Sequence, residues 1–148
     1  MKISQGPYID IILTHFHIQD ANSTSTPLNK SVKLMAMVPT QMIDVPYTTA
    51  VSSLMYAALR TRPNIAFAIQ HLSQFINSHG PEHWTTVKHM LMYLKGTQDN
   101  SITFRQDKGP DLQIYTDSDF ANRTDALSIG GYVGILGGGT IAWSSKKQ

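Results

Sequence analysis

The stretch VPYTTAVSSLMYAALRTRPNIAFAIQHLSQF, residues 45–75, decides the fold of the larger part of the chain. Its apolar residues recur three and four positions apart, which is the spacing of one face of an α-helix. Pro46 suits the first turn of a helix, whereas Pro63 disfavours the helical conformation of Arg62. The stretch therefore predicts two helices that meet near Pro63. Their apolar faces are expected to hold Ala50, Val51, Leu54, Met55 and Ala58 in the first helix and Ile65, Ile69, Leu72 and Ile76 in the second.

Further helices are predicted on both sides of this stretch. Residues 7–18 place apolar side chains at helical spacing. Another helix begins at Pro81 and closes at Gly96, which is expected to cap it in a left-handed conformation. Residues 20–44 are rich in Ser, Thr, Asn and Pro and predict a long loop. Because such a loop is unusual in a compact domain, we expect it to be ordered only against a segment that this chain lacks.

After Gly96 the hydrophobic period changes from 3.6 towards 2, which indicates strands. Short strands are predicted at residues 101–105, 112–117, 131–136 and 140–144. Gly137–Gly139 is predicted to join the last two as a hairpin, and a phosphate loop is disfavoured there because such a loop opens a helix. The last three strands are expected to form an antiparallel meander. The predicted fold class is α+β, with a sheet that lacks a covering helix and so favours association.

Composition predicts a globular protein. Apolar residues make up 41% of the 148 residues and charged residues 15%, which allows a core and argues against wholesale disorder. Residues 1–96 hold seven Lys or Arg against four acids, and residues 97–148 hold five against six, so only the first part is basic. The absence of cysteine excludes disulfides and thiolate metal sites. No apolar run reaches the roughly 18 residues of a membrane span and no signal peptide is recognisable, so we expect an intracellular protein without a membrane partner.

Four stretches resemble one family in the same order. They are ISQGPYIDIILTHFHIQD (3–20) with STPLN (25–29), the stretch 45–75, HGPEHWTTVKHMLMYLKGT (79–97), and YTDSDFA (115–121) with GGYVGILGGGTIAWSSKKQ (130–148). The second is similar to the family pattern Y-x-x-A-V-G-S-L-x-Y-x-x-x-x-T-R-P-D-I, and the third to P-x-x-x-H-W-x-A-x-K-x-x-L-R-Y-L-x-G-T. Together they cover nearly the whole chain, which resembles part of the polyprotein of copia-type retrotransposons.

The resemblance implies three segments. Residues 1–44 resemble a helix-loop segment that follows the polymerase palm, and residues 45–97 a helical thumb and connection region of the reverse transcriptase. Residues 98–148 resemble the first three strands of a truncated RNase H-like domain. The implied partners are an RNA–DNA hybrid or duplex, weakly bound, and the missing remainder of the polyprotein. The family's polymerase aspartates lie in a Y-V-D-D turn upstream of the matched region, so polymerase activity is not expected.

Asp117 matches the first metal-binding aspartate of the family's RNase H domain. Asp119 lies two residues further on, and residues two apart in a strand share a face, so both carboxylates are candidate ligands of one Mg²⁺. RNase H chemistry uses two metal ions, and the resemblance places the further acids after residue 148. We therefore expect a remnant site that does not bind Mg²⁺ tightly, in a chain that is inactive alone. Asn122 and the run Ala126–Ile129 depart from the glycine and basic residues of the family.

Lys88 and Lys95 are candidate nucleic-acid contacts. They are seven residues apart on one predicted helix and so share a face that can approach phosphates. A plain solvated face is the alternative interpretation. Three function classes therefore stay open: an inactive enzyme fragment, a weak duplex-binding module, and a protein-interaction module adopted by the host.

Trp84 and the paired histidines are expected to have structural roles. Trp84 lies on the apolar stripe of the same helix, which favours core packing over stacking on a base. The four histidines that form close pairs are interpreted as surface or helix-end residues, because no third metal ligand is indicated. These histidines are His15, His17, His79 and His83.

Overall fold

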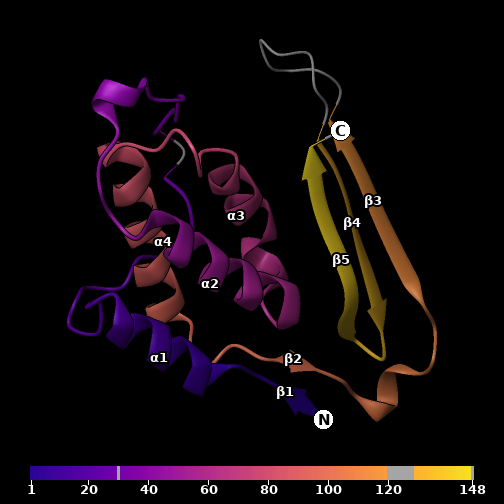
Figure 1. Cartoon of the computed structure of the whole chain (residues 1–148). Helices are drawn as coiled ribbons and strands as arrows, with labels where there is room; N and C mark the ends of the chain where they lie inside the picture. The colour runs from indigo at the N-terminus through magenta and orange to yellow at the C-terminus, as the bar shows by residue number, and fades with distance from the viewer. Residues whose placement is uncertain (30, 120–128, 148) are drawn as a thin grey trace.

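The computed structural model describes residues 1–29, 31–119 and 129–147, without the side chains of residues 118, 119, 129 and 147. In these ranges the helices lie together on one side of the molecule and a three-stranded sheet lies on the other (Figure 1). The helices are α1 (Gly6–His15), α2 (Tyr47–Arg60), α3 (Ala66–Ser73) and α4 (Pro81–Gly96). None of them has the length and apolar content needed to span a bilayer.

The predicted helices are confirmed, and their apolar stripes form one core. α2 packs against α3 and α4, and α1 packs against α4. Leu54, Leu72 and Leu91, one from each of α2, α3 and α4, are fully buried. Burying such a side chain stabilises the fold by roughly 1.5–3 kcal/mol. α3 is shorter than the spacing predicted, because Pro63–Ile65 forms a separate 3₁₀ turn before it.

The long loop between α1 and α2 packs on the chain's own helices, so the expectation that it needs an absent segment is wrong. The Thr24 hydroxyl donates to the carbonyl of His89 on α4, and His89 Nε2 lies 2.8 Å from the Thr26 carbonyl oxygen. Further along, the Met37 N–H donates to the Ser78 carbonyl over 2.9 Å. These bonds satisfy backbone polar groups that a loop otherwise leaves to water.

The predicted left-handed cap at Gly96 is also wrong. Gly96 is the last helical residue of α4, and the following Thr97 has a φ of −129°. A Cβ added at Gly96 would lie 2.7 Å from the Cβ of Ser23, which is closer than real Cβ atoms approach. The glycine therefore allows the long loop to cross α4 at close range.

The predicted antiparallel meander is confirmed. β3 (Gln113–Asp119), β4 (Ile129–Leu136) and β5 (Gly139–Lys147) are hydrogen-bonded in the order β3-β4-β5. Gly137 and Gly138, with φ of 57° and 73°, make the two-residue turn of the β4–β5 hairpin. Both residues of this turn type need positive φ, which glycine adopts without strain.

Two further contacts join the sheet to the helices. β1 (Lys2–Ile3) pairs antiparallel with β2 (Ile102–Thr103), just before the sheet. β5 lies beside α3, and the Trp143 indole N–H donates to the Ala58 carbonyl of α2 over 2.7 Å. The expectation of a sheet without helical cover is therefore wrong at β5, whereas β3 is the strand farthest from the helices (Figure 1).

Candidate functional site

Asp117 lies on β3, the outer strand, and its side chain is exposed. At this register position its neighbour on β4 is Gly131. Facing residues of antiparallel strands share a side of the sheet, so the glycine puts no side chain over the Asp117 carboxylate. The carboxylate is therefore open to solvent.

The second predicted ligand is described only by its backbone. Asp119 pairs with Ile129 at the end of the same ladder, but its side chain, together with Asn122 and residues 126–128, lies outside the described residues. The shared face of the two carboxylates stays a prediction. Among the residues that the structure describes, no group of three or more His, Cys, Asp or Glu side chains is placed to hold a metal ion. A two-metal site needs several carboxylates, so these residues do not form one by themselves.

The two candidate lysines of α4 differ in their surroundings. The Lys95 ammonium donates to the carbonyl of Ala21 over 2.6 Å, so it helps to hold the long loop. Lys88 is half-buried and has no hydrogen bond or ion pair within the described ranges. Trp84 packs against the core as predicted, with its ring 6.3 Å from that of Phe16. Lys88 is thus the better placed of the two lysines for a nucleic-acid contact.

The four histidines lie at the surface or at a helix end, as interpreted, but the two at the start of α4 are not exposed. His15 and His17 are exposed, as expected, but His79 and His83 are buried. His79 stacks on Tyr47 with ring centroids 4.5 Å apart, and His83 packs on Phe75 at the same separation. The backbone approach of α2 to the start of α4 produces this burial, and helical periodicity alone does not reveal it.

His83 is a buried base that also accepts a hydrogen bond. The Gly80 N–H donates to its Nδ1 over 3.1 Å, at the first turn of α4. Its Nε2 is buried and has no hydrogen-bond partner. Burial holds the pKa of His83 below its ordinary value, because an imidazolium would have to give up its hydration.

Arg62 is a functional candidate that the sequence reasoning missed. The side chain is 1% exposed, and its Nη1 donates to the Thr97 carbonyl over 2.8 Å. Nη2 donates to the Thr97 hydroxyl, and Nε donates to Asn64 Oδ1 over 3.3 Å. Asn64 in turn donates to the Tyr93 hydroxyl over 2.7 Å. Arg62 stands in the T-R-P of the family pattern quoted above, and Pro63 restricts its backbone, but neither signal indicates that its side chain is buried.

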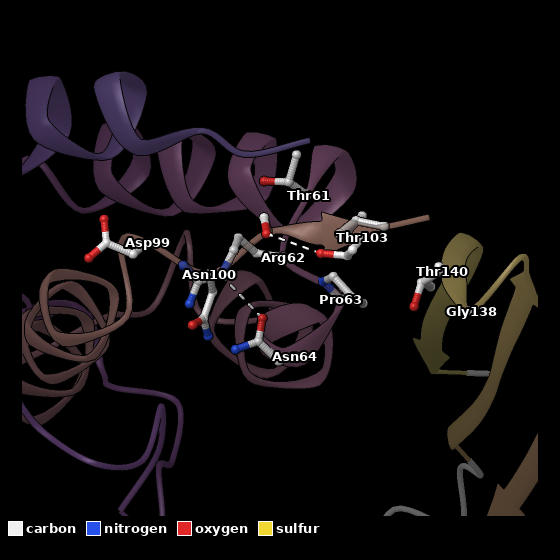
Figure 2. Close-up of a pocket in the computed structure, with 12 residues that line it drawn as sticks. Thr61, Arg62, Pro63, Asn64, Asp99, Asn100, Thr103, Gly138 and Thr140 are labelled. Atoms are coloured by element: carbon white, nitrogen blue, oxygen red, sulfur yellow. Dashed lines mark hydrogen bonds between the residues drawn. The ribbon is translucent and has the colours of Figure 1, made fainter. Parts of the chain in front are cut away.

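Arg62 lies at a polar cleft between the helices and the sheet. Figure 2 shows residues 61–64 on one side of this cleft and Gly138 and Thr140 of the hairpin on the other. The cleft has a volume of about 450 Å³. We call it the Arg62 cleft. Its polar lining residues include Thr61, Asn64, Asp99, Asn100, Ser101 and Thr140.

Comparison with known proteins finds retrotransposon relatives. The chain is 42% identical to the "Retrovirus-related Pol polyprotein from transposon TNT 1-94" of Nicotiana tabacum, over 99% of this chain and 12% of that protein. It is 36% identical to the "Retrovirus-related Pol polyprotein from transposon RE2" of Arabidopsis thaliana, over 100% of this chain and 10% of that protein. It is also 40% identical to "Secreted RxLR effector protein 161" of Plasmopara viticola, over 72% of this chain and 76% of that protein.

No protein-family model and no solved structure matches the chain. The chain spans about a tenth of the length of the Pol polyproteins, so it corresponds to a small part of each. The four motifs quoted above are spread along the chain, and the similarity likewise runs from one end to the other. Homologous over its whole length, the chain belongs to the family of copia-type retrotransposon Pol polyproteins.

Proposed function

We propose that this chain is the part of a copia-type polyprotein in which the reverse transcriptase ends and the RNase H domain begins. In this assignment residues 1–44 follow the polymerase palm, residues 45–97 form the thumb and connection region, and residues 98–148 open an RNase H-like domain. The exposed carboxylate of Asp117 is the observation that carries the proposal. It lies on an antiparallel meander that follows a helical region, in a homologue of Pol polyproteins.

In this role the chain does not cut nucleic acid by itself. Magnesium binds oxygen ligands in a near-octahedral arrangement, and a two-metal site needs carboxylates from several elements. Asp117 supplies one such group. The remaining acids are assigned to other parts of the polyprotein, and the chain's own contribution is to place the first carboxylate on a rigid strand.

Complementation tests this assignment. The purified chain should leave an RNA–DNA hybrid uncut in millimolar Mg²⁺ or Mn²⁺. A chimera that appends the remaining half of a related copia-type RNase H domain should cut the RNA strand, and Asp117→Asn should abolish the cutting. Asp111→Asn is the matched control, because it removes an exposed acid just before β3 and should leave cutting intact. Cutting by the unmodified chain, or full activity of the Asp117→Asn chimera, would overturn the assignment.

Weak binding of an RNA–DNA duplex is a second candidate function. Lys88 favours it, because its ammonium has no partner within the described ranges. The excess of three positive charges in residues 1–96 allows only a few phosphate contacts.

We also propose an intracellular location, as for an element that copies its own RNA. The relative from Plasmopara viticola is named as a secreted protein. The alternative function for this chain is therefore a protein-interaction module adopted by the host.

A further inference from the structure

The β4–β5 hairpin carries no charge over nearly its whole length. Residues 129–145 include no acid, no lysine or arginine, and no histidine. A strand with one face in water normally alternates apolar side chains with polar ones. The hairpin lacks this alternation, and such a pattern is typical of strands that are covered on both faces.

One side of the sheet collects apolar side chains from all three strands. Facing residues share a side, and Gly134 on β4 faces Ile114 on β3 and Ala142 on β5. A Cβ added at Gly134 would lie 3.9 Å from Ile141 Cγ1, so Ile141 lies on this side as well. Tyr132, two residues before Gly134, also shares it. We call the side formed by these five residues the open face.

The open face is exposed to solvent. The exposed fraction is 63% for Ile114 and 46% for both Tyr132 and Ile141. Two cations stand at its margins. Lys146 lies at the far end of β5, and Arg60 lies where α2 ends. An exposed apolar patch with a polar margin is typical of a protein–protein contact.

A groove borders the open face beside the end of α2. Tyr132, Ile141 and Ala142 line it together with Leu59 of α2 and Ile3 of β1, and its volume is about 410 Å³. The groove lies on the β5 side of the sheet, next to the helices, whereas β3 forms the outer edge (Figure 1). The molecule therefore has an exposed apolar side chain on the outer strand and an apolar groove beside the inner one.

We propose that the open face binds the open face of a second copy of this chain in a symmetric dimer. When two sheets pack face to face about a two-fold axis along their strands, β3 of each copy lies over β5 of the other. Ile114 of one copy then contacts the groove of the other, and this contact occurs twice. The same axis puts the cations of the two copies at opposite margins, so like charges do not face each other.

The size of the open face predicts weak association. Strand spacing and rise give it a projected area of roughly 300 Å². The groove adds to the area that each copy would bury, but the total stays in the range of transient contacts, below about 1,200 Å² for both copies together. The dimer is therefore expected to dissociate on dilution.

The proposal goes beyond the function proposed above. Asp117 faces Gly131, the neighbour of Tyr132, so its carboxylate lies on the opposite side of the sheet. The dimer leaves that carboxylate uncovered, and its formation does not depend on cutting of nucleic acid.

Sedimentation equilibrium of the full chain, from micromolar to millimolar concentration, tests the proposal. The mass should rise from one copy to two and stop there. Amide NMR shifts on dilution should concentrate on residues 114, 132 and 140–142, and on residues 59 and 60. A mass that stays at one copy, or that continues to grow beyond two, overturns the dimer.

Two tyrosines on opposite sides of the sheet give a matched pair of variants. Tyr132→Glu puts a carboxylate on the central strand of the open face and should weaken dimerisation about tenfold or more, because like charges would meet in the contact. Tyr115→Glu is the control, since Tyr115 is 58% exposed and pairs with Val133 on the opposite side. Equal weakening by both variants would overturn the proposal.

A second pair uses two isoleucines of similar exposure. Ile114→Glu on the open face should also weaken dimerisation, whereas Ile11→Glu, at a position of α1 that is 66% exposed, should not. Far-UV circular dichroism and thermal unfolding identify any variant that does not fold. This pair keeps the comparison decisive if Tyr132→Glu unfolds, and equal responses of Ile114→Glu and Ile11→Glu would contradict the open face as the contact.

Mixed variants test whether the two open faces meet. Tyr132→Lys alone should weaken dimerisation as Tyr132→Glu does, but an equimolar mixture of the two should associate more strongly than either, because opposite charges then meet. A mixture no stronger than its components would overturn the symmetric dimer. A deoxythymidine oligomer that shifts the open-face amides while the chain stays monomeric would assign the face to a nucleic-acid strand and overturn it too.

Discussion

The indole N–H of Trp143 on β5 donates to the backbone carbonyl of Ala58 in the last turn of α2, over 2.7 Å. The last four carbonyls of a helix have no partner inside the helix, and α2 ends at Arg60. The sheet therefore satisfies a group that the helix leaves open. This bond connects the proposed thumb and connection region with the proposed start of the RNase H-like domain.

Trp143→Phe should loosen the sheet from the helices. Phenylalanine keeps an aromatic ring but leaves the Ala58 carbonyl without its donor, which costs about 1 kcal/mol of unfolding free energy. Hydrogen exchange should accelerate in β5, and chemical denaturation should report the loss of stability. Trp84→Phe is the control, because its indole has no hydrogen bond within the described ranges, and it should leave β5 exchange unchanged. Equal acceleration of β5 exchange in both variants would contradict a role for this bond.

Gly96→Ala should destabilise the fold, although alanine favours a helix by roughly 1 kcal/mol over glycine. The added methyl group would approach the Cβ of Ser23 to 2.7 Å. Overpacking of this kind costs about 1–3 kcal/mol and outweighs the propensity gain. Thermal unfolding measures the effect. The double variant Ser23→Gly with Gly96→Ala should recover the loss, and failure of this rescue would show that the contact is not the cause.

His83 should make stability depend on pH. Its pKa in the folded chain is lowered by burial, whereas the unfolded value is about 6.5, so the unfolded chain binds more protons between the two values. The contribution of His83 is complete above about pH 6.5 and is lost as the pH falls towards the folded pKa. Its slope reaches at most about 1.4 kcal/mol per pH unit.

A comparison of two histidine variants isolates this contribution. His83→Asn keeps an acceptor near Nδ1 for the Gly80 N–H and removes the titrating ring. Its unfolding free energy should therefore fall less steeply than that of the parent chain between pH 7 and pH 5. His15→Asn removes an exposed imidazole and should leave the slope unchanged. A parent slope that persists in His83→Asn would assign the pH dependence to another group.

Lys88→Ala should weaken duplex binding and reduce its salt dependence. Two to four phosphate contacts correspond to a log–log slope of affinity against salt of about −2 to −4, at roughly −0.9 per phosphate. Losing Lys88 should lower the magnitude of this slope by about one. Lys95→Ala should have the smaller effect on the slope, because the Lys95 ammonium already donates to Ala21. A parent slope near zero, or a strong sequence preference, would reject the duplex-binding candidate.

Elements with a regular period were predictable from the sequence. The helical spacing around Leu54, Leu72 and Leu91 predicted the core residues. Each of these helices has a single apolar stripe, and that stripe faces the other helices. The glycines between β4 and β5 gave the hairpin, since its turn needs two residues with positive φ. β1 could not be predicted, because its two residues are too few to show a period.

The polar interior was not predictable in the same way. Burial of His83 and Arg62 depends on how α2, α4 and the segment after Pro63 approach one another, and a local pattern does not contain that information. Asp117 came from the family resemblance; the structure shows its side chain exposed on β3, and its role stays a proposal. The spacing of side chains also does not show that Gly96 makes room for the loop around Ser23, where a helix cap was predicted.

The pairing of β1 with β2 joins Ile3 to Ile102 and so closes a loop of about 100 residues. On a ribosome, Ile3 emerges long before its partner, so this pairing forms only after all four described helices have been synthesised. Such long-range closure is slow compared with helix formation. The helices therefore assemble first. The β1–β2 pairing then joins the N-terminal residues to the segment between α4 and the three-stranded sheet.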